Sequence, residues 1–278
     1  MMKKKRKNIP FIISSIIFFG ALVCLILYIY SIKTDNDKIE VLRKTKELSD
    51  NTESKEELGY YLINGVVVQE GLKDIYLKNS DTVGWIKKDN TNIDYPVMYT
   101  PDDEQYYLHT GFDKKYSFGG CIFIGSGANI ENPSNSIVIY GHHMIDKSMF
   151  TNIENYKEEN YYKLNKTFTF DTLRQTGTYE VIAAFPTQIY PDDYEGFQYY
   201  KYGKNLSEDE FNEFRENINK LTLYKTTTQA EYGDQIIMLS TCAYHTLNGR
   251  FVVVAKRVKG LEVDLNKEPI KVINTEDK

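Results

Sequence analysis

Residues 9–30 form an uncharged and almost entirely apolar stretch, which limits the possible folds more than any other feature of the sequence. At a rise of about 1.5 Å per residue, a helix of this length crosses the ~30 Å hydrocarbon core of a bilayer. Its far end carries Tyr28 and Tyr30, and such aromatic residues are common at membrane interfaces. The stretch is longer than the apolar part of a signal peptide (about 7–15 residues), and no small-residue cleavage site follows it. We therefore expect an uncleaved transmembrane signal anchor here, rather than a cleaved signal or a buried core helix.

The charges around this stretch predict its orientation. Five basic residues precede it at positions 3–7, although the whole chain has a net charge of −5. Because basic residues beside a span stay in the cytoplasm, we expect residues 1–8 to be a cytoplasmic tip and the part beyond Ser31 to be extracellular. That part is acidic, which argues against binding to nucleic acid.

The composition divides the remainder into a stalk, a domain and a tail. Residues 31–58 are rich in Lys, Glu and Asp, and predict a charged, partly helical stalk. Its sparse apolar residues are Ile39, Leu42 and Leu48. Residues 59–260 are predicted to form the main domain, and residues 261–278 a C-terminal tail.

The main domain has the sequence pattern of a mainly β protein. Short runs of β-branched and aromatic residues alternate with polar turns, as expected for strands. Eight such runs are present, at 83–87, 93–99, 120–124, 136–140, 167–172, 178–184, 235–240 and 251–257. Eight strands of this length predict a closed barrel or a sandwich.

Two segments interrupt the β pattern. Residues 149–162 have helical polarity and are expected to cap one end of the barrel. Residues 207–223 predict a helix inserted between the sixth and seventh strands, because Ser207 and Glu210 match a capping box and apolar residues recur on one face. We expect that apolar face to pack against the barrel.

Three residues at the ends of predicted strands have catalytic potential: His142, Cys242 and Arg250. A Cys thiolate is a nucleophile, a neighbouring cation favours the thiolate, and a His can protonate a leaving amine. Arg is a suitable donor to an oxyanion. The three residue types are therefore sufficient for acyl transfer through a thioester, although a buried structural Cys and a hydrogen-bonded His are the commoner explanations of such residues.

Several motifs, in order along the chain, resemble those of the sortases, which are membrane-anchored cysteine transpeptidases of Gram-positive bacteria. Three signature segments are Tyr140-Gly141-His142, Leu239-Ser240-Thr241-Cys242 and Arg250-Phe251-Val252-Val253. Class B in particular is indicated by residues 82–86, 93–97 and 107–109, by His143 with Met149-Phe150, and by the long inserted helix. The resemblance extends from about residue 80 to residue 258.

This resemblance implies a sortase-like closed eight-stranded barrel and a role for each of the three residues. Cys242 is the expected nucleophile, His142 the general acid and base, and Arg250 the stabiliser of substrate and oxyanion. The other histidines, His109, His143 and His245, match no catalytic position. Cys121 is expected to be a buried, inert thiol.

Residues near the nucleophile are expected to bind substrate. Ser240 and Thr241 directly precede Cys242. Tyr194 lies in a Tyr-rich segment, residues 187–202, that leads into the inserted helix and is expected to form one wall of the groove.

The implied reaction is cleavage of a C-terminal sorting signal of a secreted protein after Thr, followed by transfer to an amine. The expected acceptor is cell-wall peptidoglycan or its lipid-linked precursor, and no metal or organic cofactor is required. Two alternatives remain open at this point: a pilus-assembling sortase with a Lys acceptor, and an inactive membrane-tethered barrel that only binds peptides. The sorting motif is also left open.

Overall fold

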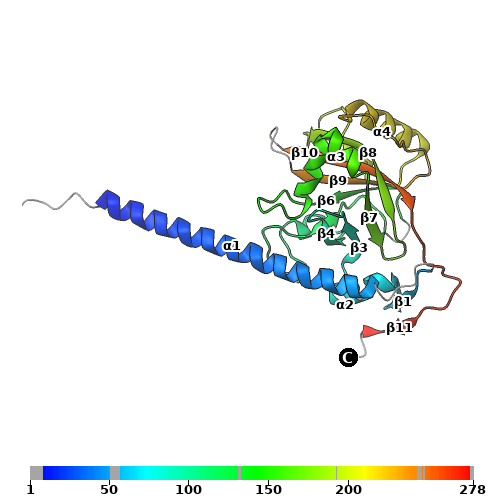
Figure 1. The fold of residues 1–278 in the computed structure, drawn as a ribbon, viewed down its shortest axis with the longest axis horizontal. Coiled ribbons are helices and arrows are strands. Elements are labelled where there is room, and N and C mark those ends of the chain that lie inside the picture. Colours follow the sequence, from blue (N-terminus) through cyan, green and yellow to red (C-terminus); the bar gives the residue numbers. More distant parts are fainter. Residues whose placement is uncertain are drawn as a thin grey trace, which may run out of the picture.

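The computed structural model describes residues 9–50, 57–130, 133–191, 193–242, 246 and 248–275 of the chain (Figure 1). The predicted cytoplasmic tip at 1–8 lies outside these residues, and so does His245.

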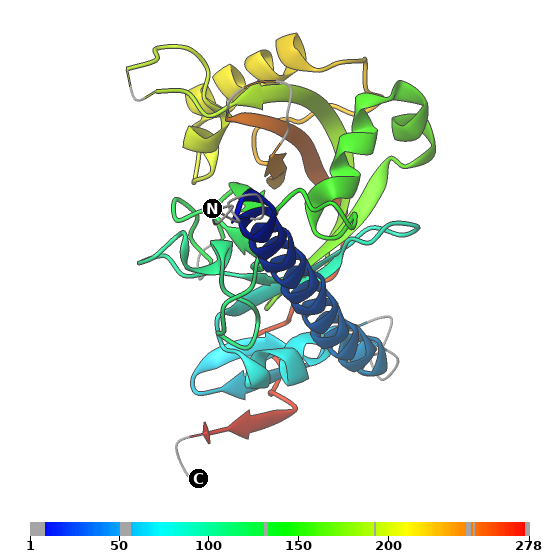
Figure 2. The same ribbon diagram turned by 90° about the vertical axis from the view of Figure 1, so that its left-hand side faces the viewer.

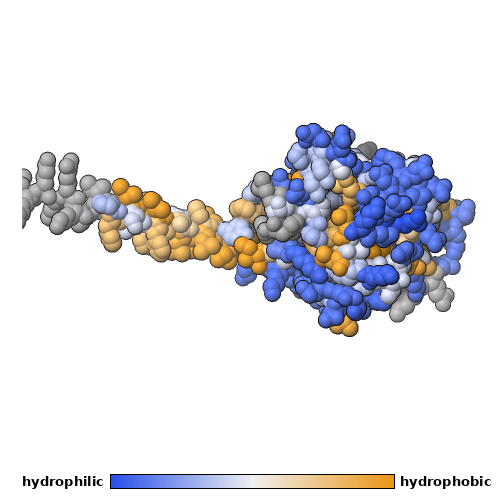
Figure 3. All heavy atoms as spheres, turned by 90° about the horizontal axis from the view of Figure 1, so that it is seen from above, coloured by the Kyte–Doolittle hydropathy of each residue, from blue (hydrophilic) through white to orange (hydrophobic). Residues whose placement is uncertain are grey.

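A single helix, α1 (Ile9–Asp50), contains both the apolar stretch and most of the predicted stalk. Its N-terminal part projects from the domain as an apolar rod (Figure 3). In the described part of the chain, it is the one helix long and apolar enough to cross a membrane. Its C-terminal part lies against the domain, where Ile39 and Leu42 are buried, whereas Leu48 is exposed. Leu48 therefore lies on the face of α1 that is turned to solvent.

The mainly β prediction and the closed eight-stranded barrel are confirmed, with strands in the order β10-β8-β7-β3-β4-β5-β6-β9. The strands are β3 (Thr82–Lys87), β4 (Asp94–Met98), β5 (Ile122–Ile124), β6 (Ser136–Tyr140), β7 (Thr167–Thr172), β8 (Thr178–Gln188), β9 (Ile236–Cys242) and β10 (Gly249–Lys259). The barrel closes because β9 pairs with β6 on one side and with β10 on the other.

Successive side chains of the strands belong in turn to two hydrophobic clusters, one on each face of the sheet. Ile139, Leu239 and Val253 belong to the cluster that fills the barrel. Their neighbours Met238 and Val252 belong to a second cluster on the opposite face of the sheet, which includes residues of α4. Successive residues of a strand point to opposite faces, so both faces of β6, β9 and β10 are covered.

The inserted helix is confirmed as α4 (Glu208–Leu221), between the sixth and seventh barrel strands. Ser207 is its N-cap, and the predicted capping box with Glu210 is present. The segment at 149–162 is not one α-helix, because it forms a 3₁₀ helix, η3 (Phe150–Lys157), followed by α3 (Glu159–Leu164).

A small three-stranded sheet was not predicted. It consists of β1 (Tyr60–Ile63), β2 (Val66–Gln69) and β11 (Lys271–Ile273), and β11 lies within the predicted tail. The remaining short helices are η1 (Glu70–Leu72), α2 (Lys73–Lys78), η2 (Tyr106–Leu108) and η4 (Tyr199–Tyr202). The domain boundaries expected at residues 30, 58 and 260 stay predictions.

The docking of α1 predicts unequal effects of the same substitution at two of its leucines. Leu42→Ala removes a buried side chain and is expected to lower the free energy of unfolding by about 2–3 kcal/mol. Leu48→Ala is the matched control on the same helix and is expected to change it by less than about 0.5 kcal/mol. Urea denaturation of the full chain in detergent micelles measures both values. Equal losses in the two variants would contradict the docking.

Candidate active site

The three predicted catalytic residues lie at the ends of three adjacent strands of the barrel, or in the case of His142 two residues beyond one. In β10, Arg250 lies directly opposite Cys242 of β9. In the parallel pair β6–β9, Tyr140 is level with Ser240. The backbone N–H of Gly141 donates to the carbonyl of Ser240, 3.1 Å away, so this pairing continues one residue past β6.

The register also brings the three residues to one face of the sheet. His142 follows Tyr140 by two residues, just as Cys242 follows Ser240 by two. Because side chains alternate with a period of two, Cys242 and Arg250 share the face that carries Met238 and Val252. His142 lies two residues beyond the end of β6, at the level of Cys242. The structure therefore brings the three predicted residues together at one corner of the barrel.

Cys242 is the last residue of β9 and is partly accessible to solvent. Residues 243–245 and 247, between Cys242 and Arg250, lie outside the described part of the chain. The preceding side chains, Ser240 and Thr241, are both buried.

His142 is held by a segment that the sequence did not connect with catalysis. Its Nε2 lies 2.8 Å from the carbonyl oxygen of Leu108. A carbonyl oxygen only accepts hydrogen bonds, so Nε2 carries the proton and the neutral ring has its lone pair on Nδ1. The ring also stacks on His109, with centroids 5.6 Å apart. His109 is thus a neighbour of the predicted catalytic His, although it matches no catalytic position.

The environment of His142 favours its neutral form. Burial lowers the pKa of His142 from its ordinary value of 6.5, and the charges of His109 and Arg250 lower it further. The hydrogen bond to Leu108 acts in the opposite direction but is the smaller effect. A neutral imidazole near pH 7 is able to accept a proton from a thiol.

Arg250 is half-buried and bonds to its own backbone neighbours. Its Nη1 donates to the carbonyls of Gly249, at 3.0 Å, and Asn248, at 3.3 Å. The fork of a guanidinium has five N–H donors, so further donors are available to a substrate.

Tyr199 is a buried neighbour of the site that the sequence analysis did not single out. Its hydroxyl shares a 2.7 Å hydrogen bond with the Ser240 hydroxyl, directly behind Cys242. Burial is the main cause that raises the pKa of Tyr199, to about 12. Its only sequence signal is its place in the Tyr-rich segment 187–202.

Tyr194, the residue chosen from that segment, lies in a different environment. Its ring is partly exposed and stacks on Tyr190, with centroids 4.0 Å apart. The carbonyl of Tyr194 accepts a hydrogen bond from Gln198. Substrate binding by Tyr194, Ser240 and Thr241 stays a prediction.

Two residues rejected as catalytic have other surroundings. His143 lies 3.4 Å from a carboxylate oxygen of Glu154. Cys121 is buried, and this burial raises the pKa of its thiol. A buried neutral thiol is a weak nucleophile.

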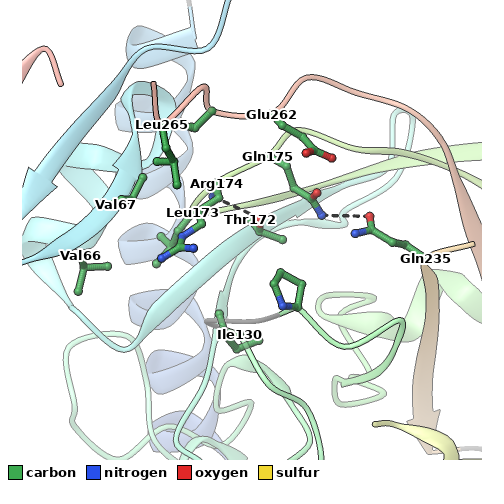
Figure 4. A pocket seen from close by; sticks show the side chains of 12 residues that line it. Val66, Val67, Ile130, Thr172, Leu173, Arg174, Gln175, Gln235, Glu262 and Leu265 are labelled. Atoms are coloured by element: carbon green, nitrogen blue, oxygen red, sulfur yellow. Dashed lines mark hydrogen bonds between the residues drawn. The ribbon is translucent and has the colours of Figure 1, made fainter. Parts of the chain in front are cut away.

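Neither a metal centre nor the cavity in Figure 4 coincides with this corner. Within the described ranges, no group of three or more His, Cys, Asp or Glu side chains has the geometry to hold a metal ion. The cavity, of about 370 Å³, lies between β2, the β7–β8 turn and residues 262–265, and Gln175 donates to Gln235 at its edge (Figure 4).

Comparisons with known proteins give a consistent result. Residues 86–258 match the family model of the sortase domain. Sortase B of Staphylococcus aureus is 28% identical over 183 residues, which cover 65% of this chain and 72% of that protein. Sortase B of Listeria monocytogenes is 29% identical over 198 residues, which cover 70% and 77%. A structure of a Staphylococcus aureus sortase B–substrate complex superposes with a TM-score of 0.68 at 25% identity, covering 82% of this chain and 97% of that one.

The surroundings of His142 predict how its pKa responds to substitution. His109→Gln removes a like charge and is expected to raise the pKa of His142, whereas His143→Gln is the control and is expected to leave it unchanged. Titration of the His ring signals by NMR, assigned with a His142→Gln variant, measures both.

Because the pKa of His142 is lowered in the folded chain, the stability of the fold depends on pH. The folded chain binds the His142 proton less readily than the unfolded chain, so this residue lowers stability as the pH falls below 6.5. A wild-type His142 midpoint above 6.5 would contradict the environment described here.

Proposed function

The chain belongs to the sortase family, as a class B member, and is a cysteine transpeptidase in general terms; from this premise we propose that Cys242, His142 and Arg250 are its catalytic residues. The observation that supports the proposal is the strand register, in which Cys242 pairs with Arg250 of β10 while β6, which ends two residues before His142, pairs with the other side of β9. Each residue type matches a step of acyl transfer, as follows.

In the first half-reaction, the thiol proton of Cys242 passes to the neutral ring of His142, and Sγ attacks the carbonyl carbon of a Thr in the sorting signal. The negative charge that develops on the carbonyl oxygen is stabilised by the guanidinium of Arg250. When the C–N bond breaks, the leaving amine takes the proton from His142. The product is a thioester on Cys242 and a free distal peptide.

In the second half-reaction, an amine attacks the thioester and gives its proton to His142. The C–S bond breaks, a new amide forms, and the thiolate of Cys242 takes the proton back from His142. The proposed amine belongs to cell-wall peptidoglycan or its lipid-linked precursor. The solved complex of Staphylococcus aureus sortase B with a substrate supports a peptide as acyl donor for this chain.

The proposed substrate-binding residues have different geometric relations to Cys242. Ser240 and Thr241 are buried, so their proposed role is to set the position of the end of β9 that carries Cys242. The hydrogen bond between Ser240 and Tyr199 connects this end of β9 to η4. Tyr194 is partly exposed and is free to meet a peptide in the groove.

The proposed location is the cell membrane, with one span, a cytoplasmic N-terminus and an extracellular domain. The apolar part of α1, in which no described residue is buried, supports a span at 9–30. The basic residues at 3–7 support the orientation.

The identity of the nucleophile is tested with a matched pair of thiol variants. The full chain in detergent micelles is incubated with a library of Thr-containing C-terminal peptides and with amine acceptors, including a peptidoglycan stem peptide and a Lys-containing protein segment. Mass spectrometry is expected to detect a thioester on Cys242 in the wild type and in Cys121→Ala, and none in Cys242→Ala, because Cys121 is buried whereas Cys242 is partly accessible. A dead Cys121→Ala variant would overturn the assignment, and the acceptor consumed identifies the transferred product.

Arg250 is tested by a substitution that keeps its charge. Arg250→Lys loses the planar fork of donors, and kcat is expected to fall by about 10²–10³. Arg257→Lys, on the same strand, is the control and is expected to keep near-native kcat in the folded enzyme. Near-native turnover in Arg250→Lys would show that a positive charge alone is sufficient, and near-native turnover in Arg250→Ala would remove this residue from the catalytic set.

Topology is tested by protease treatment of intact, wall-stripped cells. The protease is expected to remove the domain beyond Ser31 and to leave an N-terminal tag intact, because the basic tip stays in the cytoplasm. Detergent-permeabilised cells are the control, in which the tag is also lost. A protected domain in intact cells would reverse the proposed orientation.

A further inference from the structure

The apolar part of α1 reaches the domain without a spacer. The ring of Tyr28, near the end of the apolar stretch, meets the ring of Phe118 edge-on at 5.1 Å. Further along the helix, Asn36 donates to Asp146 at 3.1 Å, and Lys38 lies 3.2 Å from Asp113. Two loops, residues 110–120 and 142–149, therefore border the part of α1 that leaves the domain. Figure 2, which faces the N-terminal end of α1, shows loops of the domain around the helix on this side.

These two loops carry an exposed apolar surface. Tyr116 is 66% exposed, Phe118 42% and Ile145 89%. Ile145 has the highest exposed fraction among the large apolar side chains described in the domain. The loops touch each other, since a Cβ added to Gly119 would lie 3.5 Å from Met144. We call Tyr116, Phe118 and Ile145 the interfacial patch.

The charges on the two loops are arranged so that acidic groups turn to α1. Asp113 is paired with Lys38, and Asp146 accepts from Asn36. The other charged residues of these loops are Lys114, Lys115 and Lys147. Exposed lysines beside aromatic rings are compatible with lipid headgroups.

We infer that the interfacial patch lies in the headgroup region of the membrane that α1 spans. The inference rests on the membrane anchor of the proposed function. Tyr28 marks the depth: it belongs to the apolar stretch, and Phe118 touches it. Tyr and Trp are favoured at this depth because their rings are largely apolar and carry one polar group. A continuous helix leaves no flexible joint that would lift the domain away.

The patch places the catalytic residues close to the bilayer. Phe118 packs on Tyr116 at 5.3 Å, Tyr116 on His109 at 6.4 Å, and His109 on His142 at 5.6 Å. Ring contacts thus lead from the membrane helix to the proposed general base. The domain is therefore built to act on acyl donors and acceptors that are held at the membrane surface.

The chain has a single tryptophan, Trp85, which is buried and serves as an internal reference. The full chain is reconstituted into phosphatidylcholine–phosphatidylglycerol vesicles that contain lipid with a nitroxide near the headgroup. Ile145→Trp is the probe and Phe118→Trp a second one. Leu265→Trp is the matched control, because Leu265 is also exposed but lies on the cavity beside β2.

We expect the nitroxide lipid to quench about half of the tryptophan fluorescence that Ile145→Trp and Phe118→Trp add. It is expected to quench little of the fluorescence that Leu265→Trp adds, and little of the fluorescence of Trp85. Alkaline carbonate extraction of the same vesicles tests the anchor separately. If the chain resists extraction and positions 145 and 118 are not quenched, the interfacial patch is overturned while the anchor stands. If carbonate extracts the chain, the anchor fails and the inference fails with it.

Discussion

The proposed site depends on one constraint, the position of strand β9 between a parallel partner, β6, and an antiparallel partner, β10. The first pairing brings the end of β6 level with the end of β9, and the second places Arg250 opposite Cys242. Because side chains alternate, a slip of one residue in either pairing would turn a member of the trio to the other face. The register is secured by burial on both faces, since one set of side chains fills the barrel and the other packs against α4. A single pairing pattern therefore stabilises the fold and assembles the site.

The proposed proton transfer by His142 depends on its surroundings as well as on its position. The carbonyl of Leu108 fixes one ring nitrogen as a donor, and His109 stacks against the ring. Burial then lowers the pKa of His142, so the neutral form predominates near pH 7. Leu108 is the last residue of η2 and His109 the next residue, and both lie next to the loop 110–120 that contacts α1. The membrane helix and the proposed general base are thus connected through a few packed rings.

The fold was predictable from the sequence where the pattern is local and strong. The barrel strands, the capping box of Ser207 and Glu210, and the apolar stretch each depend on residues close together in the chain. The small sheet was missed because its strands have only three or four residues, and because β11 pairs with β1 from the other end of the chain. The stretch 149–162 has helical polarity in the sequence, but polarity alone does not distinguish a 3₁₀ helix from an α-helix.

For the site, the sequence by itself determined the identities of Cys242, His142 and Arg250 and their places at strand ends. Motif spacing is a property of the chain, so it is visible without a structure. Only the tertiary structure decided that Tyr199 bonds to Ser240 near the proposed nucleophile, that Leu108 orients His142, and that α1 docks on the domain. These contacts join segments that are distant in sequence, and their energies arise from burial and ring packing that exist only after the barrel has closed.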